Sequence, residues 1–267
     1  MRKLLCLIIL CSIILPAWSQ ADHKLADLGL KGKVSSVIEH EYQIANDGEK
    51  EIRRNVYSFN QTGCKLEEEC SDPMSKVFYS AKFKYYPSGE LQEENVNNCG
   101  HSTDYIKTYD WSPGKLNINI QYPSEQPVLY SKYTLNSKGK IIKRIDYDKG
   151  GTFRVIDYDY TPAGNLQTEK QLMQGSVNMN FKYSYNGKGQ IEKKIETNNA
   201  GKVMHTTTYT YDDKGNVISE VASYTDDPNI LTLTYKYVYD SNGNWTEKQE
   251  YMDNNLFSLV KREIAYF

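Results

Sequence analysis

The stretch Tyr209-Thr-Tyr-Asp-Asp-Lys-Gly215 is one copy of a pattern that returns through most of the 267 residues. The pattern runs from an aromatic residue to a glycine, and successive copies stand 25 to 28 residues apart. They end at Gly63, Gly89, Gly114, Gly139, Gly164, Gly189, Gly215 and Gly243. A fixed period of this length indicates a repeat architecture in which each unit is one supersecondary element. The repeat therefore decides the fold class.

Each copy predicts a β-hairpin. Asp212 stands at the fourth position, where a short Asp or Asn side chain accepts a hydrogen bond from the backbone two residues on and favours a type I turn. Gly215 then suits the left-handed residue that closes such a turn with a bulge. Pro87 and Pro162 fall at the second turn position, which their fixed φ favours. Pro113 falls one place later, in a copy that is one residue short.

The two strands of each hairpin carry an apolar and a polar face. The aromatic residues six and four places before each glycine share one face, since side chains alternate with period two. The second residue after the glycine is apolar and the fifth is polar, namely Glu68, Glu94, Asn119, Arg144, Glu169, Lys194, Glu220 and Lys248. The alternation therefore predicts a solvated face that includes the fifth residue. It places Glu93, Lys143, Lys193 and Glu247 on the otherwise apolar face.

A second set of turn-forming segments, such as Asp148-Lys-Gly-Gly151 and Asn198-Asn-Ala-Gly201, lies between the glycine turns. Together the two sets predict about 18 short strands. We expect an all-β fold over residues 32–267, with no helix and no domain boundary. The fold is an antiparallel meander of 25-residue hairpin repeats that forms a curved or coiled sheet. Because a lone hairpin is marginal in water, this sheet must curl, fold back or dimerise to bury its apolar face.

The first 19 residues have the charged, apolar and small-residue regions of a signal peptide: Met1-Arg-Lys, Leu4 to Leu15, and Pro16 to Ser19. Cleavage after Ser19 predicts export to the periplasm, the cell surface or the medium. Leu10 before Cys11 is too large for a good lipoprotein box. Residues 20–31 predict a polar, mobile lead-in. No later stretch is long and apolar enough for a membrane helix.

Export leaves three cysteines, Cys64, Cys70 and Cys99, so that at most one internal disulfide can form. Cys64 and Cys70 lie along one strand, too far apart to join. Cys70 and Cys99 belong to the same end of the sheet about two strands apart, near the geometric limit for a bridge. Cys70–Cys99 is therefore the candidate disulfide, and no cysteine has metal-ligand spacing.

The composition excludes several functions. With a net charge of −2 there is no electrostatic argument for nucleic acid. The four histidines are scattered, and no long insertion interrupts the period to form a catalytic loop, so we expect no enzymatic activity and no cofactor. The segment Asp240-Ser-Asn-Gly-Asn244 resembles half of a calcium loop, but the repeat turn explains it without a metal.

Binding candidates are aromatic residues outside the repeat phase. Tyrosine and tryptophan offer an apolar ring with a polar edge, which suits stacking against sugars. Most tyrosines are in phase and predict core positions. Tyr86 and Trp111 stand at the first turn position, where packing does not require them, and are the candidate binding residues.

The sequence Tyr-x-Tyr-Asp-x-x-Gly followed by an apolar residue resembles the YD repeat, also called the Rhs repeat, over about Tyr57 to Trp245. The resemblance implies a β architecture and a location at the cell surface. Larger members of that family form a hollow β shell that encloses a toxin or belongs to an adhesion protein. This chain has too few repeats for a closed shell of that size and has no toxin-like C-terminal extension.

Three functional interpretations follow from the sequence. The first is an exported, non-enzymatic repeat protein whose β surface binds carbohydrate or an envelope protein. The second is an accessory or remnant shell component of an Rhs-type toxin or contact-dependent system. The third is an outer-membrane barrel, which the strand number, the signal peptide and the terminal Phe267 favour. Charges expected on the apolar face, where each would cost about 2–4 kcal/mol against lipid, disfavour the third.

Overall fold

The computed structural model describes residues 24–267 apart from 46, 75, 101 and 174–177, and this part of the chain is all-β. The predicted signal peptide, residues 1–19, lies outside it. A single 3₁₀ turn, η1 (Leu25–Leu28), precedes eighteen strands. These are β1 (Val34–Ala45), β2 (Gly48–Phe59), β3 (Lys65–Ser71), β4 (Val77–Tyr85), β5 (Leu91–Asn97), β6 (Tyr105–Ser112), β7 (Lys115–Gln121), β8 (Val128–Leu135), β9 (Ile141–Asp148), β10 (Gly151–Tyr160), β11 (Leu166–Met173), β12 (Met179–Tyr185), β13 (Ile191–Asn198), β14 (Val203–Tyr211), β15 (Val217–Tyr224), β16 (Asp227–Tyr239), β17 (Trp245–Met252) and β18 (Asn255–Tyr266).

The sheet closes into a barrel. Every strand pairs antiparallel with its neighbours in the chain, and β18 pairs with β1 from Val34 opposite Tyr266 to Gln43 opposite Ser258, with one register shift between Val34 and Ser36. The antiparallel meander is confirmed, whereas the curved or coiled open sheet is wrong. Closure removes the two edges that an open sheet would present for aggregation, and the seam between β1 and β18 lies outside the repeat pattern that the sequence shows.

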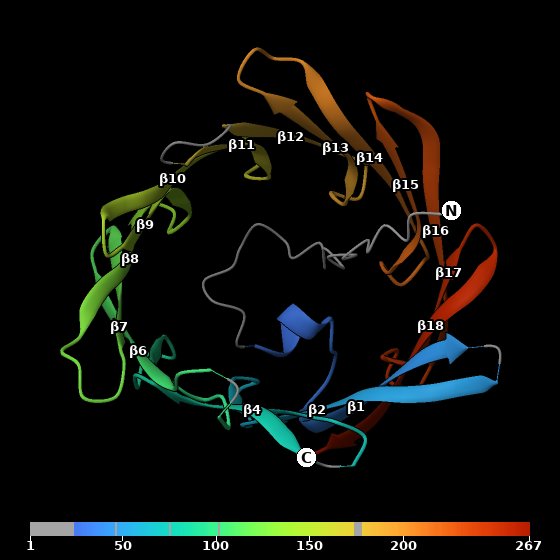
Figure 1. Ribbon diagram of the computed structural model, residues 1–267, viewed down its shortest axis with the longest axis horizontal. Coiled ribbons are helices and arrows are strands. Elements are labelled where there is room, and N and C mark those ends of the chain that lie inside the picture. Colours follow the sequence, from blue (N-terminus) through green and yellow to red (C-terminus); the bar gives the residue numbers. More distant parts are fainter. Residues whose placement is uncertain (1–23, 46, 75, 101, 174–177) are drawn as a thin grey trace.

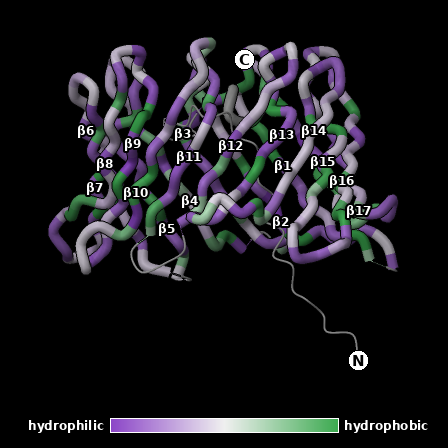
Figure 2. Tube along the Cα trace, turned by 90° about the horizontal axis from the view of Figure 1, so that it is seen from above, coloured by the Kyte–Doolittle hydropathy of each residue, from purple (hydrophilic) through white to green (hydrophobic). Residues whose placement is uncertain are grey.

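Seen down its axis, the barrel is a ring with η1 on the inside, next to β1 and β2 (Figure 1). From the side, the strands run obliquely between two ends that are edged by hairpin turns (Figure 2). One end, which we call the glycine end, holds the turns that finish in the repeat glycines. All eight of these glycines have positive φ, between +70° and +95°, as the turn type predicts.

The repeat aromatics face the interior. Leu25, at the start of η1 inside the ring, belongs to one buried cluster with Tyr57 and Phe59. Since side chains on one strand alternate between faces, the equivalent aromatics of the other copies also point inward. A second buried cluster continues along β4 to β7 and holds Ala81, Phe83, Leu91, Val96, Tyr109, Leu116 and Ile118.

The predicted phase is wrong beyond every repeat glycine turn except the one that ends at Gly114. In β5, Leu91 stands opposite Tyr85, but Glu93 stands opposite Lys84 and Glu94 opposite Phe83, because the register shifts between these pairs. One extra residue is accommodated there as a bulge, and every later side chain changes face. Glu93, Lys143, Lys193 and Glu247 are therefore on the outer face. The fifth residues, expected on a solvated face, point into the barrel in seven copies, where each stands opposite an inward aromatic, as Glu94 does opposite Phe83. Asn119, which follows the Gly114 turn, is on the outer face as predicted, because that hairpin has no bulge.

The segment Lys24–Lys31, predicted as a mobile lead-in, is packed inside the barrel, and we call it the plug segment. Leu25 and Leu30 are 9% and 7% exposed. The Leu25 N–H donates to the Gly63 carbonyl at 2.9 Å, and Lys24 forms a β-bridge with Cys64. In the described residues, η1 is too short to cross a membrane, and no other helix is present that could.

The seam is held by buried polar contacts. Arg262 on β18 is 8% exposed, lies over the Trp245 ring at 3.3 Å and donates to Glu39 on β1 at 2.8 Å. Asn244 at the glycine end exchanges two hydrogen bonds with the Lys31 backbone, at 2.6 and 2.9 Å. The plug segment therefore connects β1 to the last hairpin.

Candidate functional site

The candidate site lies at the glycine end, on the hairpin of β12 and β13. The turn between these strands runs from Asn186 to Gln190. The Asn186 side-chain oxygen accepts from the N–H groups of Lys188 and Gln190, at 2.9 and 3.0 Å, and the Gly189 N–H donates to the Asn186 carbonyl at 3.0 Å. Gly189 has a φ of +77°. The turn is thus rigidly capped, as the sequence predicts for Asn at this position.

The second aromatic of a copy donates a hydrogen bond to a backbone carbonyl of the preceding copy. Tyr211 donates through its hydroxyl to the Ile191 carbonyl at 2.7 Å. The same contact recurs at 2.6–2.8 Å around the barrel, for the pairs Tyr85–Lys65, Trp111–Leu91, Tyr160–Ile141 and Tyr185–Leu166. Burial, aided by Glu220 and Tyr185, raises the pKa of Tyr211 to about 12, so its hydroxyl remains a donor at neutral pH.

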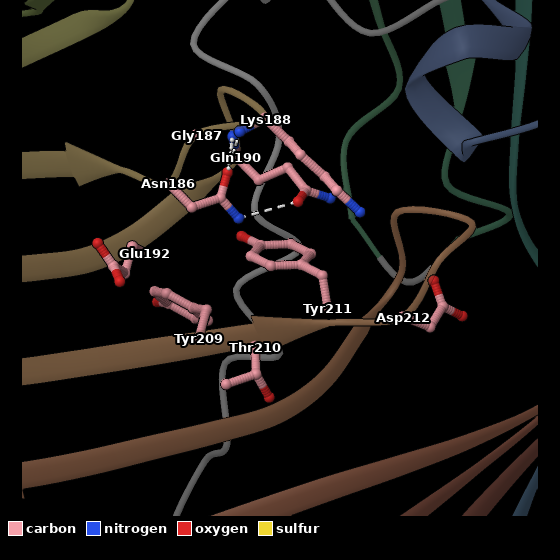
Figure 3. A pocket seen from close by; sticks show the side chains of 9 residues that line it. All are labelled: Asn186, Gly187, Lys188, Gln190, Glu192, Tyr209, Thr210, Tyr211 and Asp212. Atoms are coloured by element: carbon pink, nitrogen blue, oxygen red, sulfur yellow. Dashed lines mark hydrogen bonds between the residues drawn. The ribbon is translucent and has the colours of Figure 1, made fainter.

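A cleft of about 380 Å³ separates the Asn186–Gln190 turn from the end of β14. Tyr209 and Tyr211 supply its ring surfaces, while Asn186, Gln190 and Glu192 supply amide and carboxylate groups (Figure 3). Lys188 and Asp212 complete the charged lining, and the Asp212 side chain points away from the turn in this view. Rigid rings beside polar groups suit a ligand with apolar faces and a hydrogen-bonding edge.

Neighbouring copies fill the corresponding space with their own side chains. At the next turn, Tyr239 donates to the Asp212 carboxylate and accepts from the Asn216 amide at 2.8 Å. At an earlier turn, the Lys140 ammonium donates to the Gly164 carbonyl. Gln190 differs, because its Oε1 accepts from Asn186 Nδ2 within its own turn, at 3.0 Å. The Gln190 Nε2 lies 3.5 Å from a Cβ built on Gly215 of the next turn, and the cleft remains beside it.

The inner wall below the cleft is polar. Glu220 stands opposite Tyr209, and burial raises its pKa, although Lys194 and Tyr235 oppose that shift. Lys194 lies over the Phe181 ring at 4.7 Å. His205 stacks on Tyr224 at 4.4 Å, and burial lowers its pKa despite the nearby Glu196. This wall keeps partly exposed rings and charges that face the interior.

The residues predicted from the sequence lie elsewhere. Tyr86 does stand at the first position of its turn, half-buried, and its hydroxyl donates to the Tyr109 carbonyl at 3.3 Å. Trp111 lies within β6 instead of at a turn, packs against the buried cluster of β4 to β7 and donates to the Leu91 carbonyl. It takes the place of the second aromatic because its copy is one residue short. A binding role for either residue stays a prediction.

The three cysteines of the described residues are free thiols in the structure: Cys64 is buried, Cys70 half-buried and Cys99 exposed. Cys70 lies on β3 opposite Tyr79 of β4, and Cys99 follows the end of β5. Burial, partly opposed by Arg53, raises the pKa of Cys70 to about 11, which makes this thiol a poor nucleophile at neutral pH. The Cys70–Cys99 disulfide stays a prediction.

Sequence reasoning missed Asn186, Gln190 and Tyr211. The signal was present in the position after each repeat glycine, which holds five residue types in the eight copies. Its occupants are Cys64, Glu90, Lys115, Lys140, Asn165, Gln190, Asn216 and Asn244. A position that varies inside a regular repeat marks a place where one copy can differ in function from the others.

No protein-family model matches the chain, and no curated protein matches it. Among solved structures, a porin-like protein from Bacteroides uniformis is 13% identical with a TM-score of 0.49, over 87% of this chain and 98% of that chain. A porin-like protein from Bacteroides vulgatus is 11% identical with a TM-score of 0.45, over 74% and 97%. TcdB2-TccC3-TEV is 17% identical with a TM-score of 0.39, over 80% of this chain and 12% of that chain. Likenesses at this level assign no family, and the YD-repeat resemblance stays a prediction.

Proposed function

We propose that this protein is an exported, non-enzymatic binding protein whose barrel holds a ligand of the cell envelope, either a glycan or a segment of an envelope protein. The observation that carries the proposal is the open junction at Gln190. There a cleft of about 380 Å³ adjoins two tyrosine rings, whereas the junctions at Asn216 and Lys140 are filled from within the chain.

The rings at this junction are held in place before any ligand arrives. The Tyr211 hydroxyl is bound to the Ile191 carbonyl and the Tyr209 side chain is 5% exposed. A side chain that is already fixed loses little conformational entropy on binding, which favours affinity. Aromatic faces bordered by amides and a carboxylate fit both the apolar face of a sugar ring and an apolar peptide side chain.

The outer face of the barrel is polar at mid-strand. Cross-strand ion pairs stand there between Lys84 and Glu93 at 2.6 Å and between Lys143 and Asp157 at 3.2 Å. A charge facing lipid at the bilayer midplane costs about 2–4 kcal/mol. These pairs count against lipid around the barrel and support water on its outside. We therefore propose a binding barrel of the periplasm or the cell exterior in preference to a membrane pore.

A binding screen tests the proposal. The purified protein is applied to a glycan array and, with a photo-crosslinker, to the soluble and membrane fractions of the producing cell. We expect a saturable ligand whose binding Tyr211→Ala abolishes. Tyr160→Ala is the matched control, because Tyr160 makes the same backbone contact at a junction that Lys140 fills. Equal loss in both variants, or no ligand in either screen, would contradict the proposed site.

A further inference from the structure

The turns closed by Gly63 and Gly189 have the same construction, which the Gly139 turn shares through Asn136. At both, an asparagine side-chain oxygen accepts two backbone N–H groups: Asn60 does so at 2.9 and 3.0 Å, and Asn186 at 2.9 and 3.0 Å. The repeat glycines that close them, Gly63 and Gly189, have φ values of +81° and +77°. Both turns are also fastened by a tyrosine of the next copy at 2.7 Å.

The Gly63 turn is occupied by the plug segment. The Leu25 N–H donates to the Gly63 carbonyl at 2.9 Å. A Cβ built on Gly63 would lie 3.1 Å from Leu25 Cδ1, so the leucine side chain rests directly on the glycine. The contact continues into the β-bridge between Lys24 and Cys64. The chain itself thus shows how a turn of this construction holds an apolar peptide.

The Gly189 turn offers the same surface without an occupant among the described residues. A Cβ built on Gly189 would meet no atom of that part of the chain within 4 Å. Other copies use the glycine carbonyl as an acceptor: Gly114 accepts from the Leu135 N–H at 2.8 Å, and Gly164 accepts from the Lys140 ammonium. The cleft beside Gly189 provides room for a side chain, with tyrosine rings on its far side.

We infer that the Gly189 turn and its cleft bind an apolar, leucine-containing peptide segment of a partner protein, in the way that the Gly63 turn binds the plug segment. A backbone N–H of the peptide donates to the Gly189 carbonyl. A leucine-sized side chain rests on the glycine and fills the cleft toward Tyr211. The inference rests on the proposed binding function and selects its protein ligand over a glycan.

Charge at the cleft favours a peptide with basic flanks. Its lining holds two carboxylates, Glu192 and Asp212, and one cation, Lys188. The plug segment reads Lys-Leu-Ala-Asp-Leu-Gly-Leu-Lys from Lys24 to Lys31, with a lysine at each end. Its sequence is therefore a suitable probe, and the plug segment of the intact chain keeps the Gly63 turn occupied because it is covalently attached at high effective concentration.

The test titrates this octapeptide, acetylated and amidated at its ends, into the full-length protein and follows binding by calorimetry. We expect saturable binding of one peptide. Gly189→Asn weakens it at least about tenfold, because asparagine tolerates the left-handed backbone but places a side chain over the glycine. Gly139→Asn, at a turn with a φ of +75° whose junction the Lys140 side chain fills, is the matched control and leaves binding unchanged.

A second measurement keeps the inference testable if Gly189→Asn lowers stability. The octapeptide with serine in place of its first leucine, the counterpart of Leu25, should bind the unaltered protein at least about tenfold more weakly than the original. Absence of saturable peptide binding, or binding indifferent to both changes, overturns the inference. If a glycan then binds and Tyr211→Ala abolishes it, the proposed function stands with a different ligand; if neither ligand binds, both fail.

Discussion

The inner wall of this barrel is built from one repeat but behaves in two ways. Along β4 to β7 the side chains between the aromatics include Ala81, Val96 and Ile118 beside the ion pair of Glu94 with Lys107, and the wall is a buried core. Along β12 and β13 the corresponding positions include Lys194 and Glu196, and the rings of Phe181, Tyr183 and Tyr185 stay partly exposed. The aromatic ladder is common to both regions. The residues opposite the rings therefore decide whether the inward aromatics form a buried core or remain partly exposed to the barrel interior.

The largest expected difference is between two tyrosines at the same place in the repeat. Tyr109 is 2% exposed and donates to Glu94 at 2.9 Å, whereas Tyr183 is half-buried and donates to Glu169 at 3.4 Å. Tyr109→Ala should lower the free energy of unfolding by about 3–5 kcal/mol. Tyr183→Ala should lower it by roughly 1–2 kcal/mol. Urea unfolding of both variants measures the difference, and equal losses would show that the two walls are energetically alike.

A third region of the inner wall, around Tyr57 and Phe59, is covered by the plug segment. Leu25→Ala removes the side chain that rests on Gly63 and packs with Tyr57 and Phe59. We expect a loss of about 2–4 kcal/mol, as for other buried leucines. Hydrogen exchange should also rise in β1 and β18 more than in β6 and β7, because the plug segment bridges the seam. Uniform exchange would contradict this coupling.

Removing one hydroxyl tests the two walls more finely. Tyr85→Phe and Tyr211→Phe each delete a hydrogen bond of 2.7 Å to a backbone carbonyl. A net loss of about 0.5–1.5 kcal/mol is expected. The loss should be larger for Tyr85, which packs against the buried cluster, since water can reach the Ile191 carbonyl more easily beside the cleft. Thermal melts of the two variants measure these losses. A larger loss for Tyr211→Phe would contradict the description of the wall near Tyr85 as the more buried one.

The smallest effect concerns pH. Burial raises the pKa of Glu220 above its ordinary 4.5, so the folded state holds this proton more tightly than the unfolded chain. The contribution of protonated Glu220 to stability is therefore fully present below the unfolded-state pKa of 4.5 and is lost as pH rises through the higher pKa of the folded state. Glu220→Gln should raise the melting temperature at pH 7 and leave it unchanged near pH 3. A gain at pH 3 instead would contradict the assigned direction.

Asp146 on β9 should show the opposite pH dependence of stability, because its pKa is lowered. Burial alone would raise its pKa, but hydrogen bonds from Ser131, Arg144 and Arg154 lower it. Its contribution to stability is present above the ordinary pKa of 3.8 and is lost as pH falls through the folded value. Asp146→Asn should therefore be destabilising at pH 7 and nearly neutral in strong acid, which the same melts would record.

The sequence predicts the elements of this fold better than their closure. The repeat contains the turn chemistry of Asp212 and Gly215, so the hairpins, the strand number and the meander follow from local rules. The pairing of Val34 with Tyr266 does not, because neither residue belongs to a repeated pair. Local patterns do not determine whether distant ends meet.

Which side chains face the interior, and which residues form the cleft, were also difficult to predict from local sequence patterns. A bulge of one residue after seven of the eight repeat turns reverses the alternation, so Glu94 points inward although simple counting places it outside. Leu25 and Leu30 lie in a segment that carries no strand period, so their burial could not be inferred. The open junction depends on Gln190 having no counterpart of the Asn216–Tyr239 contact, a difference that only side-chain geometry reveals.

The pairing of β1 with β18 gives this barrel a built-in order of assembly. Every other strand pairs with its neighbour in the chain, so those hairpins can form and add to one another through short-range contacts. The seam joins Val34 to Tyr266 and must close a loop of nearly the whole domain. Its entropic cost is recovered only when all the hairpins are in place. We therefore expect the ring to close last in folding and to open first in unfolding, with the rest of the meander still intact.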